Sequence, residues 1–425
     1  MDNLSKKVIV SCFLAACLEM YDFVLFGFLV KVIHANYLSF LDENTATIIA
    51  LAFFAVGFVV RPIGALIFGH IGDVFGRKKA LVMSVSCMGI ASLSMSLLPT
   101  YAAIGIVSCY LIVLIRIIQG LSVGGEFSGA IIYAIEHFNK KKAGLVGGII
   151  ICGCITGVLL AMIMSKIVQN TNLPEYSWRF AFLVGFGLSI IGYFVRTKLL
   201  ETPEFLSSIK DKAKIPIIEG IKNHPKECLG TIAIAAANGI NFYFILFFLP
   251  SYINKILDIS VNYFPILTMI IAIFLSPILS SFSDKIGREK MLTYGLLGTS
   301  IWGYVGLQLV VIYPSVEMAI LFFFVHAIIY SAQAGTANVF VVEIFPVKYR
   351  YSCAAFCYSI GMGVIGGTSP MIASMIVTKY EAAATNILCY YMALVPLLGY
   401  AGMRLALSQY NKIQKTQEEQ GIEAI

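Results

Sequence analysis

Long apolar segments recur along the chain, with short polar segments between them. A helix needs about 20 apolar residues to cross a hydrocarbon core that is ~30 Å thick. The apolar segments that meet this length predict twelve membrane-spanning helices, at residues 8–33, 47–69, 80–98, 105–136, 143–168, 179–197, 227–250, 263–281, 291–312, 317–342, 353–378 and 385–407. The first segment contains Glu19 and Asp22 and is followed by many more, so we interpret it as a span and not as a signal peptide.

A lysine-rich polar stretch separates the first six predicted spans from the last six. We therefore expect an all-α membrane protein whose twelve helices form two six-helix bundles. The N-terminal bundle is expected at residues 1–197 and the C-terminal bundle at 227–408. A central loop at 198–226 joins them, and a short tail covers 409–425.

Basic residues are concentrated on one side of this predicted topology. That side carries Lys6, Lys7, Arg77, Lys78, Lys79, Lys140 to Lys142, Lys210, Lys212, Lys214, Lys222, Lys226, Lys285, Arg288, Lys290, Lys348 and Arg350. The opposite side carries little beyond Lys31, Lys166, Lys255 and Lys379. Cytoplasmic loops are enriched in Lys and Arg, so we expect both termini and the central loop in the cytoplasm.

Composition excludes several classes of protein. Hydrophobic residues make up 59% of the chain and charged residues only 12%, about half the share of a soluble domain. The net charge of +7 is spread over many short clusters, so no nucleic-acid partner is expected. The sequence has no Walker A motif, no H-E-x-x-H and no dinucleotide fingerprint, so we expect no nucleotide, metal or other cofactor and no enzymatic activity.

Two landmarks occur in the same order in both halves. Gly69-His-Ile-Gly-Asp73-Val-Phe-Gly76-Arg77-Lys-Lys is matched 211 positions later by Ser280-Ser-Phe-Ser-Asp284-Lys-Ile-Gly287-Arg288-Glu-Lys. Glu136-His-Phe-Asn-Lys-Lys is echoed by Glu343-Ile-Phe-Pro-Val-Lys. A duplicated unit of six spans is typical of a transporter whose site lies between the repeats.

The duplicated loops are interpreted as a conformational gate. Asp73 and Arg77 are placed to bridge neighbouring helix ends at the cytoplasmic surface, with Glu136 as a further partner. Gly69 and Gly76 permit a tight approach and a tight turn. The second-half equivalents are Asp284, Arg288 and Glu343.

Several motifs resemble those of the major facilitator superfamily. The segment Gly69 to Lys78 is similar to its signature loop between helices two and three, and Arg116-Ile-Ile-Gln-Gly120 is similar to its helix-four signature. Within that superfamily, Glu19-Met-Tyr-Asp22-Phe, Arg61-Pro-Ile-Gly64, Gly124-Gly-Glu126-Phe and Trp178-Arg179 resemble the metabolite:H⁺ symporter family, which includes bacterial proline/betaine transporters. The resemblance implies a bacterial inner-membrane transporter.

The chain departs from that family at two places. The tail after Ser408 is short, so the long C-terminal coiled coil of osmosensing betaine carriers is not expected. In the second loop Ser280 and Ser283 replace glycines, and Glu289 follows the arginine.

Three charged residues are predicted near the membrane midplane, where each needs a partner or a hydrated cavity. Counting 1.5 Å per residue places Glu19 about 16 Å and Asp22 about 21 Å along helix one. Arg116 falls about 16 Å from the outer end of helix four, at a similar depth. Two carboxyl groups that lie close together do not both ionise readily, so Asp22 or Glu19 is expected to carry a proton, with a slight preference for Asp22. Arg116 is expected to bind a substrate carboxylate.

Further polar residues in the spans are candidates for contact with substrate. Arg61 is expected either to reach the substrate or to pair with Glu126, and the sequence leaves both open. Asn238 and Asn241 lie three apart on helix seven, and Tyr21 lies between the helix-one acids. We interpret His326 as a core histidine.

An aromatic cage of Tyr21, Tyr243, Trp302 and Tyr330 is disfavoured against ordinary packing. Gln333 and Asn338 are further polar residues along the same helix as His326. Lone polar residues in a span often only hydrogen-bond neighbouring helices.

These observations predict an H⁺-coupled symporter, monomeric in the lipid bilayer, that moves proline or glycine betaine by alternating access. A citrate or dicarboxylate:H⁺ symporter is the alternative within the class. A membrane sensor or a channel is the alternative outside it, although the sequence leaves no space for a signalling domain.

Overall fold

The computed structural model describes residues 3–138, 142–170, 172–207, 214–257, 264–380 and 383–419. The elements in these ranges are all helical, and twelve helical segments are long and apolar enough to span a membrane. The predicted fold class and number of spans are confirmed. Of the predicted cytoplasmic lysines, Lys140, Lys141, Lys210 and Lys212 lie outside the described residues, as do residues 420–425 of the tail.

The first six spans come from α1, α3, α4, α6, α7 and α8. The bounds in this half are α1 (Asn3–Phe28), α2 (Val30–Tyr37), α3 (Glu43–Val74), α4 (Arg77–Leu97), α5 (Tyr101–Ile104), α6 (Val107–His137), α7 (Ala143–Val168), η2 (Glu175–Ser177) and α8 (Trp178–Thr197). Two short helices then join the halves, α9 (Pro203–Ser207) and α10 (Pro216–Asn223).

The last six spans include two that change helix type along their length. The bounds are α11 (Pro225–Tyr243), η4 (Phe244–Phe248), α12 (Leu249–Leu257), α13 (Phe264–Ile286), α14 (Arg288–Ile312), α15 (Val316–Glu343), α16 (Arg350–Tyr358), η5 (Ser359–Gly366), α17 (Ser369–Tyr380) and α18 (Ala384–Glu419). The stretches η4 and η5 are π-helical. Single-turn π segments inside α-helices are frequent at functional sites.

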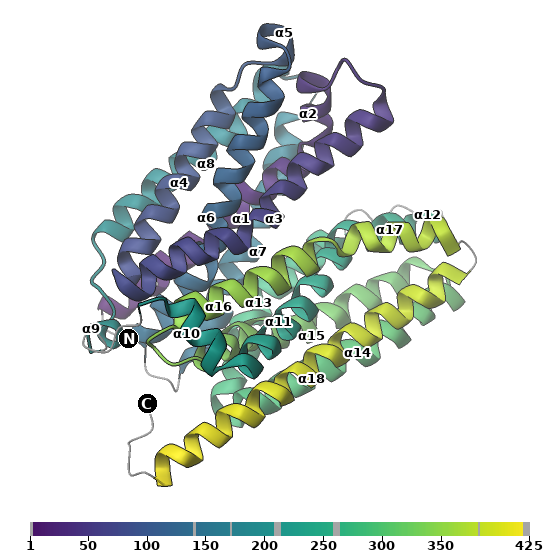
Figure 1. The fold of residues 1–425 in the computed structure, drawn as a ribbon. Helices are drawn as coiled ribbons and strands as arrows, with labels where there is room; N and C mark the ends of the chain where they lie inside the picture. Colours follow the sequence, from purple (N-terminus) through teal and green to yellow (C-terminus); the bar gives the residue numbers. More distant parts are fainter. Residues whose placement is uncertain are drawn as a thin grey trace.

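Figure 1 shows both termini, α9 and α10 at one end of the molecule, which we call the terminal face. The two bundles meet toward this face and diverge toward the ends that carry α2 and α5 in one bundle and α12 and α17 in the other (Figure 1). Between the bundles, α7 packs on α13 and α3 packs on α16. Within the first bundle the main pairs are α3 with α6, α1 with α7, and α4 with α8.

Local sequence explains where the helices begin and turn. Asp42 caps α3 by accepting a hydrogen bond from the Thr45 amide at 3.0 Å, and Ser315 caps α15 in the same way. The two repeated loops turn at Gly76 and Gly287, whose φ angles of 117° and 93° are readily available only to glycine. The repeat seen in the sequence is therefore a repeat of backbone conformation as well.

Two predicted ends differ from the observed ones. The first span was expected to run to residue 33, but α1 ends at Phe28 and a separate helix, α2, begins at Val30. The last helix continues to Glu419, so the first part of the expected tail is helical. Hydropathy predicts neither difference, because it reports how long an apolar segment is and not where the helix within it ends.

Close glycine contacts bring α6 against α3. A side chain at Gly64 would overlap the carbonyl of Leu121, and one at Gly120 would overlap the carbonyl of Gly57. Because the two helices approach at backbone distance, the side chains on their shared flank are held deep inside the bundle. Arg61 and Arg116 are among them, with exposed fractions of 1% and 0%.

Candidate functional site

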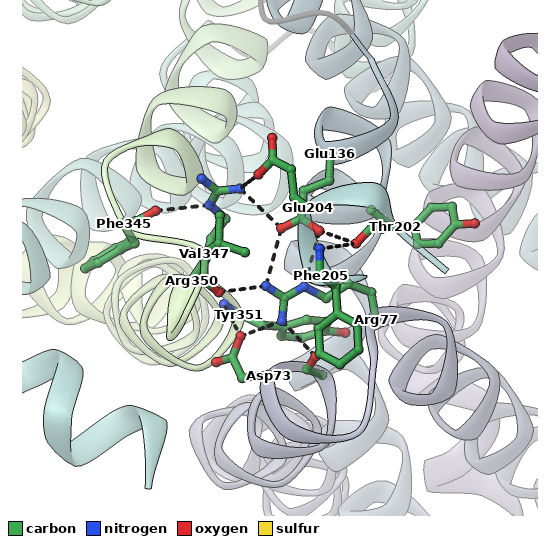
Figure 2. Close-up of polar contacts among 12 residues, drawn as sticks. Asp73, Arg77, Glu136, Thr202, Glu204, Phe205, Phe345, Val347, Arg350 and Tyr351 are labelled. Carbon is green, nitrogen blue, oxygen red and sulfur yellow. Dashed lines mark hydrogen bonds and ion pairs between the residues drawn. The ribbon is translucent and has the colours of Figure 1, made fainter. Parts of the chain in front are cut away.

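The terminal face is closed by an aspartate that caps a helix of the other bundle. Asp73, at the end of α3, accepts a hydrogen bond from the amide of Tyr351 at 3.1 Å (Figure 2). It accepts a second one from the amide of Ser352 at 2.8 Å. These amides belong to the first turn of α16, where backbone N–H groups lack intrahelical partners and favour a negative charge. Gly69 makes room for this contact, since an added Cβ there would lie 2.7 Å from the Ser352 Cα.

Arg77 ties this capping aspartate to the rest of the site. Its Nη1 lies 2.6 Å from Asp73 Oδ1, and its Nη2 lies 3.3 Å from Glu136 Oε1 (Figure 2). The same Nη2 donates across the bundle interface to the Val347 carbonyl at 2.9 Å. All three charged side chains are buried. The structure therefore brings together the first-half residues that the sequence assigned to a gate.

In the second repeat, an aspartate of the second bundle caps a helix of the first bundle. Asp284, at the end of α13, accepts from the amides of Gly144 at 2.8 Å and Leu145 at 3.0 Å, which lie in the first turn of α7. Arg288 contacts Asp284 at 2.7 Å and Glu343 at 3.3 Å. Each bundle thus supplies an aspartate that caps a helix of the other, and neither cap survives if the bundles separate here.

Sequence analysis missed the contribution of the segment that follows the sixth span. Thr202 donates to Glu136 Oε2 at 2.6 Å, and Glu204 pairs with Arg350 (Figure 2). Arg350 also contacts Glu136 Oε1 at 3.2 Å, and the Phe205 ring lies 5.5 Å from the Arg77 guanidinium carbon. The available signal is Glu201-Thr-Pro-Glu204-Phe, which lies in the segment predicted as the central loop.

The chain immediately before α16 is anchored to α11. His224 lies between Glu227 Oε1 at 3.0 Å and the Tyr349 hydroxyl at 2.8 Å. Burial raises the pKa of Tyr349 to about 12, so this hydroxyl keeps its proton at neutral pH. The anchor fixes the position of Arg350, the next residue, relative to the second bundle.

A second group of residues lies where six helices meet between the bundles. Its members interact electrostatically with one another, and we call them the central cluster: Glu19, Arg61, Cys154, Tyr243, Tyr330 and Tyr358. They come from α1, α3 and α7 on one side and from α11, α15 and α16 on the other. The helix pairing therefore places one buried acid and one buried base at the interface between the repeats.

Many polar atoms at or beside the central cluster have no hydrogen-bond partner. Both Glu19 oxygens and Arg61 Nε and Nη1 are buried and have no hydrogen-bond partner in the part of the chain that the structure describes. Burying a polar atom without a hydrogen-bond partner costs free energy of folding, unless a ligand or a water molecule supplies that partner. The same holds for amide or ring nitrogens and oxygens of Asn238, Asn241, His326, Gln333 and Asn338.

A cavity adjoins this group on the side of the second bundle. Its water-accessible volume is about 40 Å³, which is room for about three waters. Asn241, Thr268, His326 and Tyr330 line it together with apolar side chains. His326 is buried, as its interpretation as a core histidine requires, but its ring lines this cavity and its Nδ1 has no hydrogen-bond partner among the described residues.

Arg116 does not meet the helix-one acids, contrary to the estimate from depth. Its guanidinium donates to Gln119 at 2.7 Å and to the carbonyls of Phe54 at 3.0 Å and Phe53 at 3.3 Å. It also lies over the rings of three phenylalanines, 4.8 Å to 5.2 Å from their centres, at Phe23, Phe26 and Phe54. Residue counting estimates only the depth along a helix, whereas rotation about the helix axis decides which residues a side chain contacts.

The remaining candidates divide between the cluster and the first bundle. Asp22 packs against Gly185 of α8, and Tyr21 donates to the Ala181 carbonyl at 2.8 Å, so neither faces the central cluster. The pairing of Arg61 with Glu126, one of the two options left open, is wrong because Glu126 pairs with Arg196. Of the aromatic cage, Tyr243 and Tyr330 belong to the central cluster, whereas Trp302 donates to the Phe322 carbonyl elsewhere.

Comparisons with known proteins cover nearly the whole chain. A family model described as Major Facilitator Superfamily matches residues 12–303 and 231–421. The chain is 28% identical over 418 residues to the proline/betaine transporter of Salmonella typhimurium. The aligned region covers 94% of this chain and 82% of that protein. It is 27% identical over 429 residues to the glycine betaine/proline/ectoine/pipecolic acid transporter OusA of Dickeya dadantii, with the same two shares.

Solved structures share the fold at low identity. The proton:xylose symporter XylE bound to 6-bromo-6-deoxy-D-glucose matches with a TM-score of 0.76 and 16% identity over 94% of both chains. The inward open conformation of XylE from E. coli matches with a TM-score of 0.67 and 16% identity over 92% of this chain and 95% of that one. The predicted resemblance is confirmed at the level of family and fold.

Proposed function

Because the chain belongs to the Major Facilitator Superfamily, we propose that it is an H⁺-coupled symporter of a small zwitterion, proline or glycine betaine. The substrate binds at the central cluster, and the two bundles rock about it so that the site opens to one side of the membrane at a time. The bundles that move are residues 1–197 and 227–408. The protein works as a monomer in the bacterial inner membrane, with the terminal face in the cytoplasm.

The observation that carries this proposal is the pair of unpartnered opposite charges at the bundle interface. Arg61 and Glu19 are both buried, yet neither forms an ion pair among the described residues. A zwitterion supplies the carboxylate that Arg61 lacks, while Glu19 is neutralised by the proton that accompanies the substrate. The aromatic rings of Phe58 and Tyr243, 5.4 Å apart, add a surface that suits a quaternary or secondary ammonium group.

The named relatives support the same class of substrate, since two of them are described as carriers of proline and betaine. Additional arginines at the site would favour an anion with two or more carboxylates. The other buried arginine of this region, Arg116, is already surrounded by carbonyls and Gln119. One available arginine favours a single carboxylate.

Proton coupling is assigned to Glu19 in preference to Asp22. Glu19 interacts electrostatically with Glu126, Arg61 and Arg196, whereas Asp22 faces α8. When a substrate carboxylate draws the Arg61 guanidinium, the neighbouring Glu19 loses its stabilising charge and takes a proton. Release of the substrate returns the arginine and expels the proton, which couples the two fluxes.

The capping aspartates supply the conformational part of the cycle. Asp73 and Asp284 hold the terminal face closed, and both contacts must break when the site opens to that side. The cytoplasmic placement of the face rests on its excess of Lys and Arg.

Uptake by proteoliposomes tests the function. Radiolabelled proline, glycine betaine, citrate and 2-oxoglutarate are offered with and without an inward proton gradient. We expect proline or betaine to accumulate only with the gradient, and Arg61→Gln to abolish the accumulation. Arg179→Gln is the control, because Arg179 contacts the Ser96 carbonyl away from the cluster. Accumulation of citrate alone, or equal activity in Arg61→Gln, would contradict the proposal.

A further inference from the structure

A short helix at the terminal face has an apolar outer side. This helix, α10, lies between α9 and the seventh span (Figure 1). Its inner side packs on α16, because Pro216 and Gly220 are buried and a Cβ on Gly220 would overlap the Cys353 Sγ. Three isoleucines at intervals of three residues lie on the outer side, with exposed fractions of 51%, 60% and 42%: Ile215, Ile218 and Ile221. The protein therefore covers one side of α10 and leaves the large apolar side chains of the other side uncovered.

A helix of the same length shows that this exposure is not general. Like α10, α2 has eight residues and lies outside the twelve spans. In α2 the large apolar residues Ile33 and Tyr37 are buried, and Lys31 is exposed. A contiguous group of exposed apolar side chains marks a surface that another molecule or a membrane covers.

The surroundings of α10 favour the bilayer as that cover. The seventh span begins at Pro225, so His224 alone separates it from α10. Another span, α3, packs against α10. Along α3 the residues Val59, Ile63 and Ile67 are exposed at intervals of four, so they mark the side of this span that faces lipid. The isoleucines of α10 thus adjoin two segments that cross the membrane.

The exposed charges beside the isoleucines are basic. Lys214 and Lys222 are both exposed. The acid of α10, Glu219, pairs with Lys348 at 3.7 Å and accepts a hydrogen bond from the Lys214 amide at 3.1 Å. The outer side of α10 therefore combines apolar side chains with positive charge. This combination is complementary to the acyl chains and phosphate groups of an anionic lipid surface.

We propose that α10 is an interfacial helix that binds anionic phospholipids. The side chains of Ile215, Ile218 and Ile221 enter the boundary between headgroups and acyl chains, where such helices bury their apolar side about 5–10 Å deep. Lys214 and Lys222 contact headgroup phosphates, since a lysine can lay its apolar stem along the boundary and keep its charge in water. This surface goes beyond the proposed function, because it involves neither the central cluster nor the capping aspartates.

Spin-label accessibility in the reconstituted full chain tests the placement of α10. Single labels are introduced in a cysteine-free background at Ile218→Cys and, as the control on α2, at Lys31→Cys. Collisions with O₂, which concentrates among acyl chains, are compared with collisions with a water-soluble nickel chelate. Because the label at 218 enters the acyl boundary, we expect its ratio of O₂ to nickel collision rates to exceed that of the control by about threefold or more.

Quenching by brominated lipids tests the preference for negative charge. A fluorophore at Ile218→Cys is quenched by brominated phosphatidylglycerol or brominated phosphatidylcholine in vesicles of otherwise equal composition. One lysine near an anionic surface contributes about a fivefold gain in affinity, so two predict a preference for phosphatidylglycerol of about 5–30-fold. Lys214→Gln/Lys222→Gln should remove most of this preference, whereas Lys290→Gln, an exposed lysine on α14, should keep it.

A label at 218 as accessible to nickel as the control would overturn the proposal and assign the isoleucines to a soluble partner. A label shielded from both reagents, in proportion to protein density in the membrane, would instead assign them to a second copy of the chain. Equal quenching by the two lipids in the wild type would refute the binding of anionic lipid. None of these measurements requires transport, so the proposed function and this surface can fail separately.

Discussion

Asp73→Asn isolates the contact that closes the terminal face. The aspartate accepts two amide hydrogen bonds from the first turn of α16 in the other bundle, one on each carboxylate oxygen. Asparagine keeps one acceptor oxygen but turns an NH₂ donor toward the second amide. The substitution also removes the negative charge that suits a helix N-terminus.

The size of the effect follows from these contacts. A hydrogen bond to a charged group contributes about 1.5–3 kcal/mol, and 1.4 kcal/mol corresponds to about a tenfold change in an equilibrium. Loss of one such bond therefore shifts the ratio of closed to open terminal face about 10–100-fold toward open. The equivalent cap by Asp284 remains, so the closed state is weakened and not abolished.

Distances between spin labels at the terminal face measure this shift directly. Labels are placed in a cysteine-free background at two exposed positions, Lys198→Cys directly after α8 of the first bundle and Lys290→Cys in the first turn of α14 of the second. We expect Asp73→Asn to add a population with a longer distance, and Asp73→Asn/Asp284→Asn to make it dominant. Transport should fall while the order of preference among substrates is kept.

The control is Glu175→Gln, an exposed acid on the opposite face. It should leave the distance distribution unchanged. An unaltered distribution in Asp73→Asn/Asp284→Asn would refute the gate, and so would a change in which substrate is preferred.

Three further predictions concern packing and topology. Arg116→Ala should lower the melting temperature and leave the affinity for substrate unchanged, because the Arg116 guanidinium donates hydrogen bonds to carbonyls of α3. A substrate dissociation constant that rises tenfold or more would assign Arg116 to the binding site instead. Gly64→Ala should cost about 1–3 kcal/mol or prevent folding, since its Cβ would overlap the Leu121 carbonyl, and an unchanged melting temperature would show that α3 and α6 are less closely packed. A cysteine at position 212, outside the described residues, should react with an impermeant maleimide only from the cytoplasmic side, and labelling from outside would reverse the topology.

Hydropathy and the repeat were sufficient to predict the fold. The duplicated loops carried information on contacts as well, because Asp73 and Asp284 occupy equivalent turns and each caps a helix of the other bundle. That exchange between bundles was not visible in the sequence. It depends on which helix start lies opposite each loop, which is a property of the packed repeats.

The binding region was harder to predict for a geometric reason. Residue counting gives depth along a helix, and it placed Glu19, Asp22 and Arg116 at similar heights. Their neighbours are set by rotation about each axis, which turns Asp22 toward α8 and Arg116 toward the carbonyls of α3. A helix with apolar residues on all sides gives no sequence signal for that rotation.

Substrate-induced proton movement tests the central claim most directly. Proline or glycine betaine is added to weakly buffered proteoliposomes, and the external pH is followed. We predict external alkalinisation with the wild type and with Asp22→Asn, and none with Glu19→Gln, which should still exchange internal for external substrate. An absent pH change in the wild type, or one that persists undiminished in Glu19→Gln, would contradict the account.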